Sequence, residues 1–271
     1  MVRGNHGRVA DAAGTARARV MRPVLVEWRG IRVPSYPALL YLGTVLGILA
    51  ARSLAERTAV DAGRVVVAML LLFPVALVGA RLLFVAYHWG LFRLHRRWIF
   101  RRADSGASVY GGLLLTVPVS VPVLAALGLG FGAFWDLASL TMLIGMVFTK
   151  VGCLLNGCCG GRVTAGSVAL VLPDHQGNRQ RRIPAQVLEA GAALAIVVGA
   201  IALLDRRAFP GAIFLGAMAT YSVARIGLEA TRETVDRVAG ISVNQAVSVA
   251  LAALALGIFA VVWLGSHHPL A

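Results

Sequence analysis

Residues 65–89 read VVVAMLLLFPVALVGARLLFVAYHW, and Arg81 is the only one of them that is Asp, Glu, Lys or Arg. A helix needs about 20 predominantly apolar residues to cross the hydrocarbon core of a bilayer, and this run is long enough. Backbone N–H and C=O groups in hydrocarbon must be satisfied within their own segment, which favours a helix over any other structure. The run therefore predicts a membrane-spanning helix.

The rest of the chain has the same character. Of its 271 residues, 58% are hydrophobic and only 14% are charged, and the mean hydropathy is +0.78. A soluble domain carries about 25% charged residues because its surface faces water, so the composition excludes a soluble enzyme. The sequence predicts an all-α integral membrane protein with seven transmembrane helices. The predicted spans are residues 36–52, 65–89, 109–130, 134–157, 186–204, 211–229 and 244–264.

Two parts of the chain lie outside these spans. Residues 1–33 are predicted to form a basic, polar tail that is disordered or lies on the membrane surface. No apolar core follows their basic start, so they do not have the pattern of a cleaved signal peptide. Residues 34–266 form the transmembrane domain, and its longest connection, 160–183, is predicted to be a small extramembrane turn or hairpin.

Polar side chains intrude into the apolar spans at one end only. With seven spans the connections alternate between the two faces, and by this parity the intruding residues share the N-terminal face. An ionisable group at membrane depth costs about 2.5 kcal/mol or more unless it is paired or hydrated, which favours a function for these residues. A structural alternative is that Arg225 and Glu229 form an ion pair one helical turn apart. The intruding residues are Arg81, Tyr110, Lys150, Asn156, Gln186, Glu189, Tyr221, Arg225, Glu229, Asn244 and Gln245.

The charges of these residues predict what they bind. Three cations face two evident carboxylates, so we expect a polar, cationic cavity that opens toward the N-terminal face. Such a cavity suits the phosphate of a lipid headgroup. The whole chain has a net charge of +14, which reflects either a bias of genome composition or attraction to anionic lipids, worth about 1 kcal/mol per basic residue. Binding to nucleic acid is not expected, because no nucleic-acid-reading motif is present.

Four ordered motifs carry a resemblance to a known family. Residues 182–189 and 221–232 read RIPAQVLE and YSVARIGLEATR, and they follow SVYGG at 108–112 and KVGCLLNGCCGGR at 150–162. Taken together and in this order, the motifs resemble those of the prolipoprotein diacylglyceryl transferase family. The resemblance covers most of the chain, from Tyr36 in the first span to Ser248 in the last.

The resemblance implies an enzyme of the bacterial inner or plasma membrane without a cofactor or metal. It implies transfer of the diacylglyceryl group of phosphatidylglycerol to the thiol of a lipobox cysteine in an exported prolipoprotein, with release of glycerol phosphate. Cations around the leaving phosphate would stabilise the charge that develops on it. The partners are then the bilayer, phosphatidylglycerol or another anionic phospholipid, and the lipobox peptide. The implied catalytic residues are Arg225, Tyr110 and Lys150, and the implied phospholipid-binding residues are Arg81, Asn156, Gly161, Arg162, Gln186, Glu189, Tyr221 and Glu229.

The chain departs from the family pattern at four positions. Tyr110 stands where the family typically has a histidine, and Lys150 stands where it has an arginine. Cys153 and Cys158 replace an asparagine and a glutamate. Tyrosine, with an ordinary pKa of about 10, is a weaker base than histidine at neutral pH. An alternative is therefore a non-catalytic or altered-acceptor paralogue that binds anionic phospholipid in the same cavity.

Two other membrane functions fit less well. A transporter is expected to have polar groups through the whole depth of the bilayer, and here they stop within one leaflet. A retinal protein needs its Schiff-base lysine in the last span, whereas the sole lysine, Lys150, lies in the fourth.

Cys153, Cys158 and Cys159 lie within seven residues of one another. This is not a disulfide framework, and no second Cys or His cluster completes a zinc site. We expect the cysteines to pack as small apolar residues. A reactive thiolate at Cys158 or Cys159 is the alternative.

Charge and resemblance disagree about which face lies in the cytoplasm. The N-terminal face carries 18 basic residues and the opposite face 5. The positive-inside rule therefore puts the N-terminal face in the cytoplasm. The resemblance puts it outside, where exported precursors emerge, and we favour that orientation.

Overall fold

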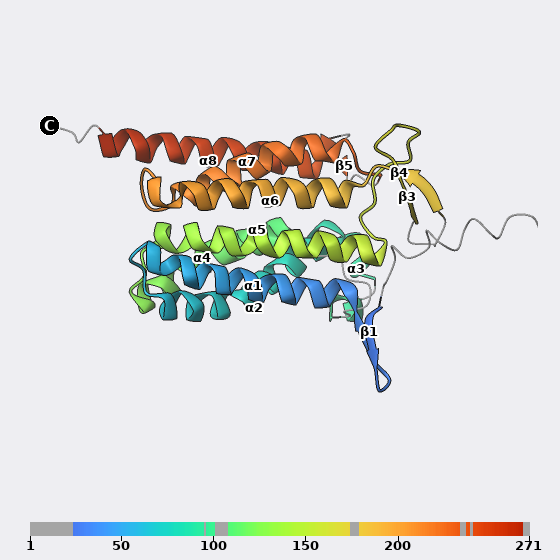
Figure 1. Cartoon of the computed structure of the whole chain (residues 1–271), viewed down its shortest axis with the longest axis horizontal. Coiled ribbons are helices and arrows are strands. Elements are labelled where there is room, and N and C mark those ends of the chain that lie inside the picture. The colour runs from blue at the N-terminus through green and yellow to red at the C-terminus, as the bar shows by residue number, and fades with distance from the viewer. Residues whose placement is uncertain are drawn as a thin grey trace, which may run out of the picture. The chain divides into compact units, whose positions relative to one another are not determined.

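The computed structural model describes residues 24–94, 96–100, 108–173, 179–233, 237–238 and 241–267. Helices make up most of this part of the chain, and all seven predicted apolar segments are helical, with boundaries that differ by a few residues (Figure 1). The long helices are α1 (Ser35–Arg57), α2 (Ala62–Tyr87), α4 (Val109–Leu127), α5 (Phe131–Asn156), α6 (Ala185–Leu203), α7 (Ala212–Glu229) and α8 (Val243–His267).

Six helices in the described residues are long and apolar enough to cross a membrane. They are α1, α2, α4, α5, α8 and the helix Ala185–Arg206, in which the 3-10 turn η3 (Leu204–Arg206) extends α6. The chain is thus a multi-pass membrane protein. Helix α7 is not among the six, because Arg225, Glu229 and several hydroxyl-bearing residues lower its hydropathy. The seventh predicted segment is a helix, and its crossing of the membrane stays a prediction.

Short strands and helices fill the connections. The strands pair as antiparallel hairpins, and the pair at 170–182 confirms the hairpin predicted in the longest connection. The strands are β1 (Val24–Trp28) with β2 (Ile31–Pro34), β3 (Leu170–Pro173) with β4 (Arg179–Arg182), and β5 (Arg237–Val238) with β6 (Ile241–Ser242). The short helices are α3 (Trp89–Phe92) and the 3-10 helix η2 (Arg96–Phe100).

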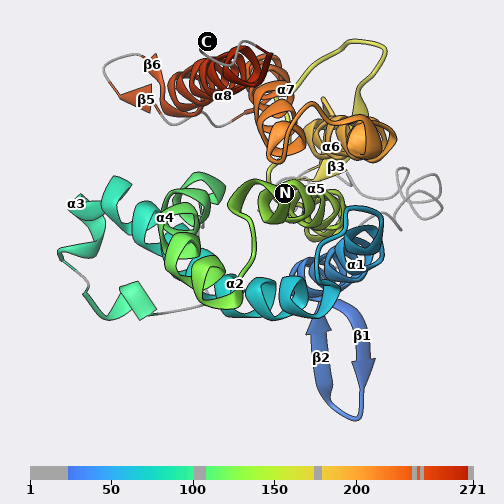
Figure 2. The ribbon, with the colours of Figure 1, turned by 90° about the vertical axis from the view of Figure 1, so that its left-hand side faces the viewer.

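The first hairpin differs from the sequence prediction. Residues 24–33 were expected to belong to the basic tail, but they form β1 and most of β2 immediately before α1 (Figure 2). Arg29 and Gly30 make the turn with φ of 49° and 81°. Two consecutive positive φ values are typical of a two-residue hairpin loop, which matches the twist of the flanking strands. Residues 1–23 of the predicted tail lie outside the described residues.

The chain divides into two compact units. The first comprises Met1–Val45, Leu143–Val197 and Thr220–Ala253, and the second comprises Leu46–Met142, Val198–Ala219 and Leu254–Ala271.

In the second unit, α2 and α4 lie side by side (Figure 2). Gly79 and Gly111 form the closest contact: a Cβ built on Gly79 would come within 3.0 Å of the Gly111 carbonyl oxygen, and a Cβ on Gly111 would do the same to the Gly79 oxygen. Small residues let the backbones of membrane helices approach this closely. The contact fixes the positions of Arg81, two residues after Gly79, and of Tyr110, directly before Gly111.

The second unit also contains a buried carboxylate that the sequence analysis did not single out. Asp136, on α5, accepts hydrogen bonds from the backbone N–H groups of Gly211 at 2.9 Å and Phe214 at 3.0 Å. Arg207 lies 3.6 Å away. These N–H groups open α7 and have no carbonyl partner within the helix, so Asp136 acts as its cap from another helix.

Candidate functional site

Three cations surround one buried carboxylate in the first unit. Glu189, in the first turns of α6, has a side chain that is 2% exposed. Its Oε1 lies 3.0 Å from Arg225 NH1 and 3.5 Å from Arg232 NH1, and its Oε2 pairs with Nζ of Lys150. The cations come from α7, the segment after α7, and α5. Three separate segments of the chain therefore converge on Glu189.

Arg225 joins this carboxylate to a second one. Its NH2 lies 2.8 Å from Oε2 of Glu229, one helical turn further along α7. The other oxygen of Glu229 accepts hydrogen bonds from Ser242 at 3.1 Å and Asn244 at 3.0 Å. The i,i+4 ion pair considered from the sequence is thus present, and it is one part of a larger network. We call Lys150, Glu189, Arg225, Glu229 and Arg232 the ion cluster.

The ion cluster carries more positive than negative groups. Removing a charged group from water costs several kcal/mol, and pairing with good geometry offsets this cost. Here three cations share two carboxylates, and the side chain of Arg225 is only 7% exposed. The cluster therefore has one cation more than it has carboxylates, and Glu189 is in contact with all three cations.

A set of backbone contacts positions the segments that carry the cluster. Gly161 is buried, and a Cβ on it would lie within 3.0 Å of the carbonyl oxygens of Ile183 and Thr231, so only glycine fits. The N–H of Arg162 donates to the Thr231 oxygen at 2.9 Å, and the N–H of Ile183 donates to the Arg162 oxygen at 3.1 Å. These bonds tie the loop after α5 to the segments that carry Gln186 and Arg232.

Gln186 has an unused acceptor. Its side chain is buried, and Nε2 donates to the carbonyl oxygen of Cys158 at 2.7 Å. Oε1 is also buried and finds no hydrogen-bond partner among the described residues. A buried acceptor without a donor loses free energy of about 1–3 kcal/mol, which a ligand hydroxyl would recover.

The remaining predicted residues of the first unit are more accessible. Asn156 is the last residue of α5 and is exposed, as is the side chain of Arg162. Tyr221 lies on α7, one turn before Arg225, and is half-buried. Asn244 contacts Glu229 directly, and Gln245 donates to the carbonyl oxygen of Ile226 at 3.3 Å.

Two predicted site residues belong to the second unit. Arg81 donates from Nε to the carbonyl oxygen of Ile99 at 3.0 Å, and its guanidinium lies 5.3 Å from the ring centroid of Phe92. Arg81 therefore holds the segment that follows α2. Tyr110 is half-buried in the first turn of α4, beside the contact between α2 and α4. The proposed roles of both residues stay predictions.

Sequence reasoning left Arg232 and Arg182 out of the site. Arg232 is the last residue of the 221–232 motif, so its spacing from Arg225 and Glu229 was available as a signal. Arg182 is buried, and it pairs with Glu233 and donates to Gln180 at 2.9 Å. Its burial follows from the β3–β4 hairpin, which the sequence predicted without a register.

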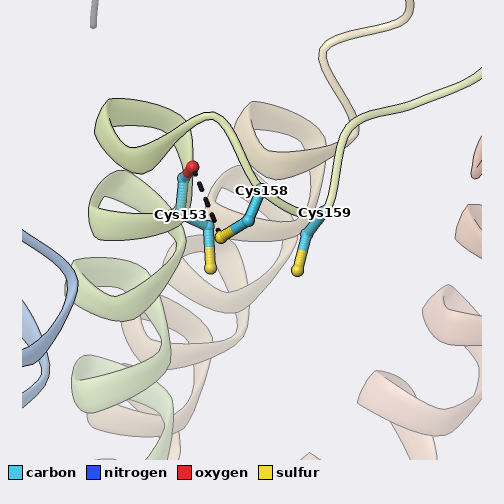
Figure 3. Close-up of side chains that lie close together, drawn as sticks. All are labelled: Cys153, Cys158 and Cys159. Atoms are coloured by element: carbon cyan, nitrogen blue, oxygen red, sulfur yellow. Dashed lines mark hydrogen bonds between the residues drawn. The ribbon is translucent and has the colours of Figure 1, made fainter. Parts of the chain in front are cut away.

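The three cysteines gather at the end of α5 (Figure 3). Their sulfur atoms all lie within 4.8 Å of one another, and the three thiols are free. Cys158 Sγ lies 3.7 Å from the carbonyl oxygen of Cys153. Hydrogen bonds from the other two thiols lower the pKa of Cys159, and the charges of Lys150 and Arg232 lower it further. The cysteines thus form a cluster close to Lys150 and Arg232, and both their expected packing and the alternative of a reactive thiolate stay predictions.

Comparisons with known proteins agree with these motifs. The family model described as prolipoprotein diacylglyceryl transferase matches residues 23–263. Curated relatives named phosphatidylglycerol–prolipoprotein diacylglyceryl transferase include one from Bacillus licheniformis, 25% identical over 88% of this chain and 88% of that protein. Those from Listeria monocytogenes and Pediococcus pentosaceus are 25% and 26% identical over 87% and 88% of this chain, and cover 88% and 89% of those proteins. The matched region contains all five residues of the ion cluster. Because the family model matches most of the chain, the chain belongs to the prolipoprotein diacylglyceryl transferase family.

Proposed function

We propose that this chain transfers the diacylglyceryl group of phosphatidylglycerol to the cysteine thiol of a prolipoprotein lipobox and releases glycerol phosphate. The ion cluster is the observation that carries this proposal. The phosphate of the lipid becomes the leaving group, and charge builds up on its oxygens as the bond to the glycerol carbon breaks. Fixed cations at that point lower the barrier, and removal of one such donor typically costs 100-fold to 1000-fold in rate.

Arg225, Arg232 and Lys150 are the residues that would hold the leaving phosphate. In the structure, Glu189 pairs with all three of these cations. An arriving phosphate diester competes with this carboxylate for the same donors, and an arginine presents a fork that suits phosphate oxygens. While the phosphate displaces Glu189, Arg225 keeps its contact with Glu229, and this contact holds the guanidinium in place.

The remaining site residues receive roles that follow from their chemistry. The unpaired oxygen of Gln186 accepts a hydrogen bond from a hydroxyl of the glycerol headgroup. Asn156, Gly161, Arg162 and Tyr221 complete the phospholipid site of the first unit, and Arg81 is a further predicted phospholipid-binding residue. Tyr110 orients the acceptor thiol by hydrogen bonding, at the position where the family pattern has a histidine. In this proposal α7 is a seventh transmembrane helix, and the site is a cationic cavity.

The proposed setting is the inner membrane of a bacterium. The precursors emerge on its outer face, so the N-terminal face of the chain lies there. The basic residues of that face then bind lipid headgroups and do not mark the cytoplasmic side. The bacterial origin of the relatives supports this setting.

A transfer assay with defined substrates tests the proposal. Purified full-length protein in nanodiscs is given phosphatidylglycerol and a lipobox peptide, and glycerol phosphate and the peptide mass are measured. We expect glycerol phosphate and the diacylglyceryl-modified peptide in equal amounts. A peptide with serine in place of cysteine is the control and should release none.

Two other outcomes would count against the transfer. Retained phospholipid without glycerol phosphate would identify a lipid-binding paralogue. Glycerol phosphate release that does not depend on the peptide thiol would identify a different acceptor, such as water.

A further inference from the structure

The three cysteines of this chain are its only cysteines, and they make a single group. Cys153 lies in the last turns of α5, and Cys158 and Cys159 follow the helix (Figure 3). Cys153 is buried, Cys158 is half-buried and Cys159 is exposed. Gly157 and Cys159 have φ of 71° and 59°. The chain therefore reverses directly after α5, which returns two thiols to the neighbourhood of the third. A non-glycine residue rarely adopts such a φ, and packing of a small apolar side chain does not require it.

The sulfur positions are compatible with one tetrahedral metal ion. A Zn–S bond of about 2.3 Å places two tetrahedral sulfur ligands about 3.8 Å apart. The three sulfurs lie within 4.8 Å of one another, so shifts of about 1 Å bring them to this spacing. A catalytic zinc site typically has three protein ligands and one open position. The described residues supply three thiols and no fourth cysteine, histidine or carboxylate in this group.

Two cations of the ion cluster act on this group. Lys150 and Arg232 both act on Cys159 with their positive charges. Three thiolates and one divalent ion carry a net charge of −1, which these cations balance. Gln186 supports the loop by donating to the carbonyl oxygen of Cys158 at 2.7 Å. Because Cys159 is exposed, the open side of the group is accessible to a further ligand.

We propose that Cys153, Cys158 and Cys159 bind one Zn²⁺ ion and that its open fourth position receives the thiol of the acceptor cysteine. The second half of this inference rests on the proposed function and names how that site activates its nucleophile. It accounts for three departures from the family pattern together, since cysteines at 153 and 158 accompany a tyrosine at 110, where the family typically has a histidine.

The step balances in atoms and electrons without any redox change. The acceptor thiol loses its proton to solvent when it coordinates, and its sulfur becomes a metal-bound thiolate. That sulfur forms a bond to the glycerol carbon while the bond from this carbon to the phosphate oxygen breaks. The electron pair of the broken bond goes to the phosphate, glycerol phosphate leaves, and the thioether product dissociates because a thioether is a weaker ligand than a thiolate.

Metal binding is tested first, without lipid or peptide. Tag-free, full-length protein is reduced, stripped with a chelator and titrated with Zn²⁺ or Co²⁺. We expect about one zinc ion per chain and a sulfur-to-cobalt charge-transfer band in the near ultraviolet. Because the chain has no other cysteine, that band reports only this group. Absence of the band, or zinc binding equal to that of the triple serine variant, overturns the proposal.

Single substitutions separate ligation from folding. Cys159→Ser changes an exposed residue without adding strain, since serine meets the same positive φ. We expect zinc affinity to fall by about 100-fold, because one of three thiolate ligands is lost. His88→Gln, which removes a histidine outside the group at the C-cap of α2, is the matched control and should leave the affinity unchanged. Unchanged affinity in Cys159→Ser would contradict the three-thiol site.

The fourth position is tested with the cobalt-loaded protein. A lipobox peptide should intensify and shift the charge-transfer band, because a fourth sulfur joins the ion, and the serine peptide should not. An unchanged band overturns the acceptor role even if metal binds. Failure here is distinguishable from failure of the proposed function, because the transfer assay detects glycerol phosphate whatever the metal content.

Discussion

Arg225 contacts two carboxylates through its two terminal nitrogens, one on its own helix and one on α6. Its planar fork makes both contacts possible, and a lysine has only one nitrogen for the same task. At the scale of the residue, this geometry decides what a conservative substitution does. A lysine at this position would keep the positive charge of Arg225 but lose the planar shape of its guanidinium, so the substitution tests the two properties separately.

Arg225→Lys should lower turnover by roughly 100-fold while the chain still inserts, since a misplaced cation no longer meets the leaving phosphate. The measurement is kcat and KM for peptide modification in nanodiscs. Arg57→Lys is the matched control, because Arg57 pairs with Asp205 on an exposed surface and an exposed pair contributes little. Equal turnover in the two variants would remove Arg225 from the catalytic site.

The sequence predicted part of this residue-scale picture. The pair of Arg225 with Glu229 follows from helical spacing, which brings residues four apart together. The contact of Arg225 with Glu189 does not follow from spacing, because the residues lie on different helices 36 positions apart. The sulfur cluster was not predicted either, because it depends on the positive φ of Cys159, and the letters CC do not reveal that conformation.

The positions of the helices follow from composition to a greater extent than the contacts of single residues do. The seven apolar segments became helices almost at the predicted bounds, because an apolar run in lipid has no other way to satisfy its backbone. The β1–β2 hairpin was missed because its turn, Arg29-Gly30, reads as part of a basic tail. Asp136 was overlooked because it lies inside an apolar segment and its partner Gly211 is 75 residues away.

Gly111→Ala should destabilise the pairing of α2 and α4. The added methyl group meets the Gly79 carbonyl and Leu83, and such overpacking costs about 1–3 kcal/mol. Thermal unfolding in detergent measures the loss. Gly199→Ala is the matched control on α6: a Cβ there meets nothing within 4 Å, so the melting temperature should hold or rise. If Gly111→Ala melts no lower than Gly199→Ala, the close contact does not contribute to stability.

Asp136→Asn should weaken the start of α7. An amide offers one acceptor where the carboxylate offers two, so one of the two N–H bonds is lost at a cost of about 2 kcal/mol. Unfolding by denaturant gives the change in free energy. Asp205→Asn, on an exposed pair, should change stability by less than about 0.5 kcal/mol. Similar values for the two variants would show that Asp136 does not cap the helix.

At the scale of the whole molecule, the number of spans sets where the ends of the chain lie. Among the described residues, six helices have the length and hydropathy needed to span a membrane, and α7 is not one of them. Its charged residues are paired with Glu189 and with each other, which removes most of the cost of placing them at membrane depth. We therefore expect α7 to cross the membrane.

Seven spans put the two ends of the chain on opposite sides, and six put them on the same side. A fluorescent protein that folds only in the cytoplasm, fused to the C-terminus, should be fluorescent, and alkaline phosphatase fused before residue 24 should be active outside. Fusions reporting the same side for both ends would show that α7 does not cross. Both reporters reversed would instead support the orientation given by the positive-inside count.

Lys150 carries the only side-chain amine of the chain, and it is held against Glu189 with 15% of its side chain exposed. Acylating reagents that modify amines will thus find one internal target, protected as long as the carboxylate is in place. Its rate of labelling becomes a direct reading of how often the pair opens. A bound phosphate that displaces Glu189 should alter that rate, which lets mass spectrometry follow occupancy of the site without any product being formed.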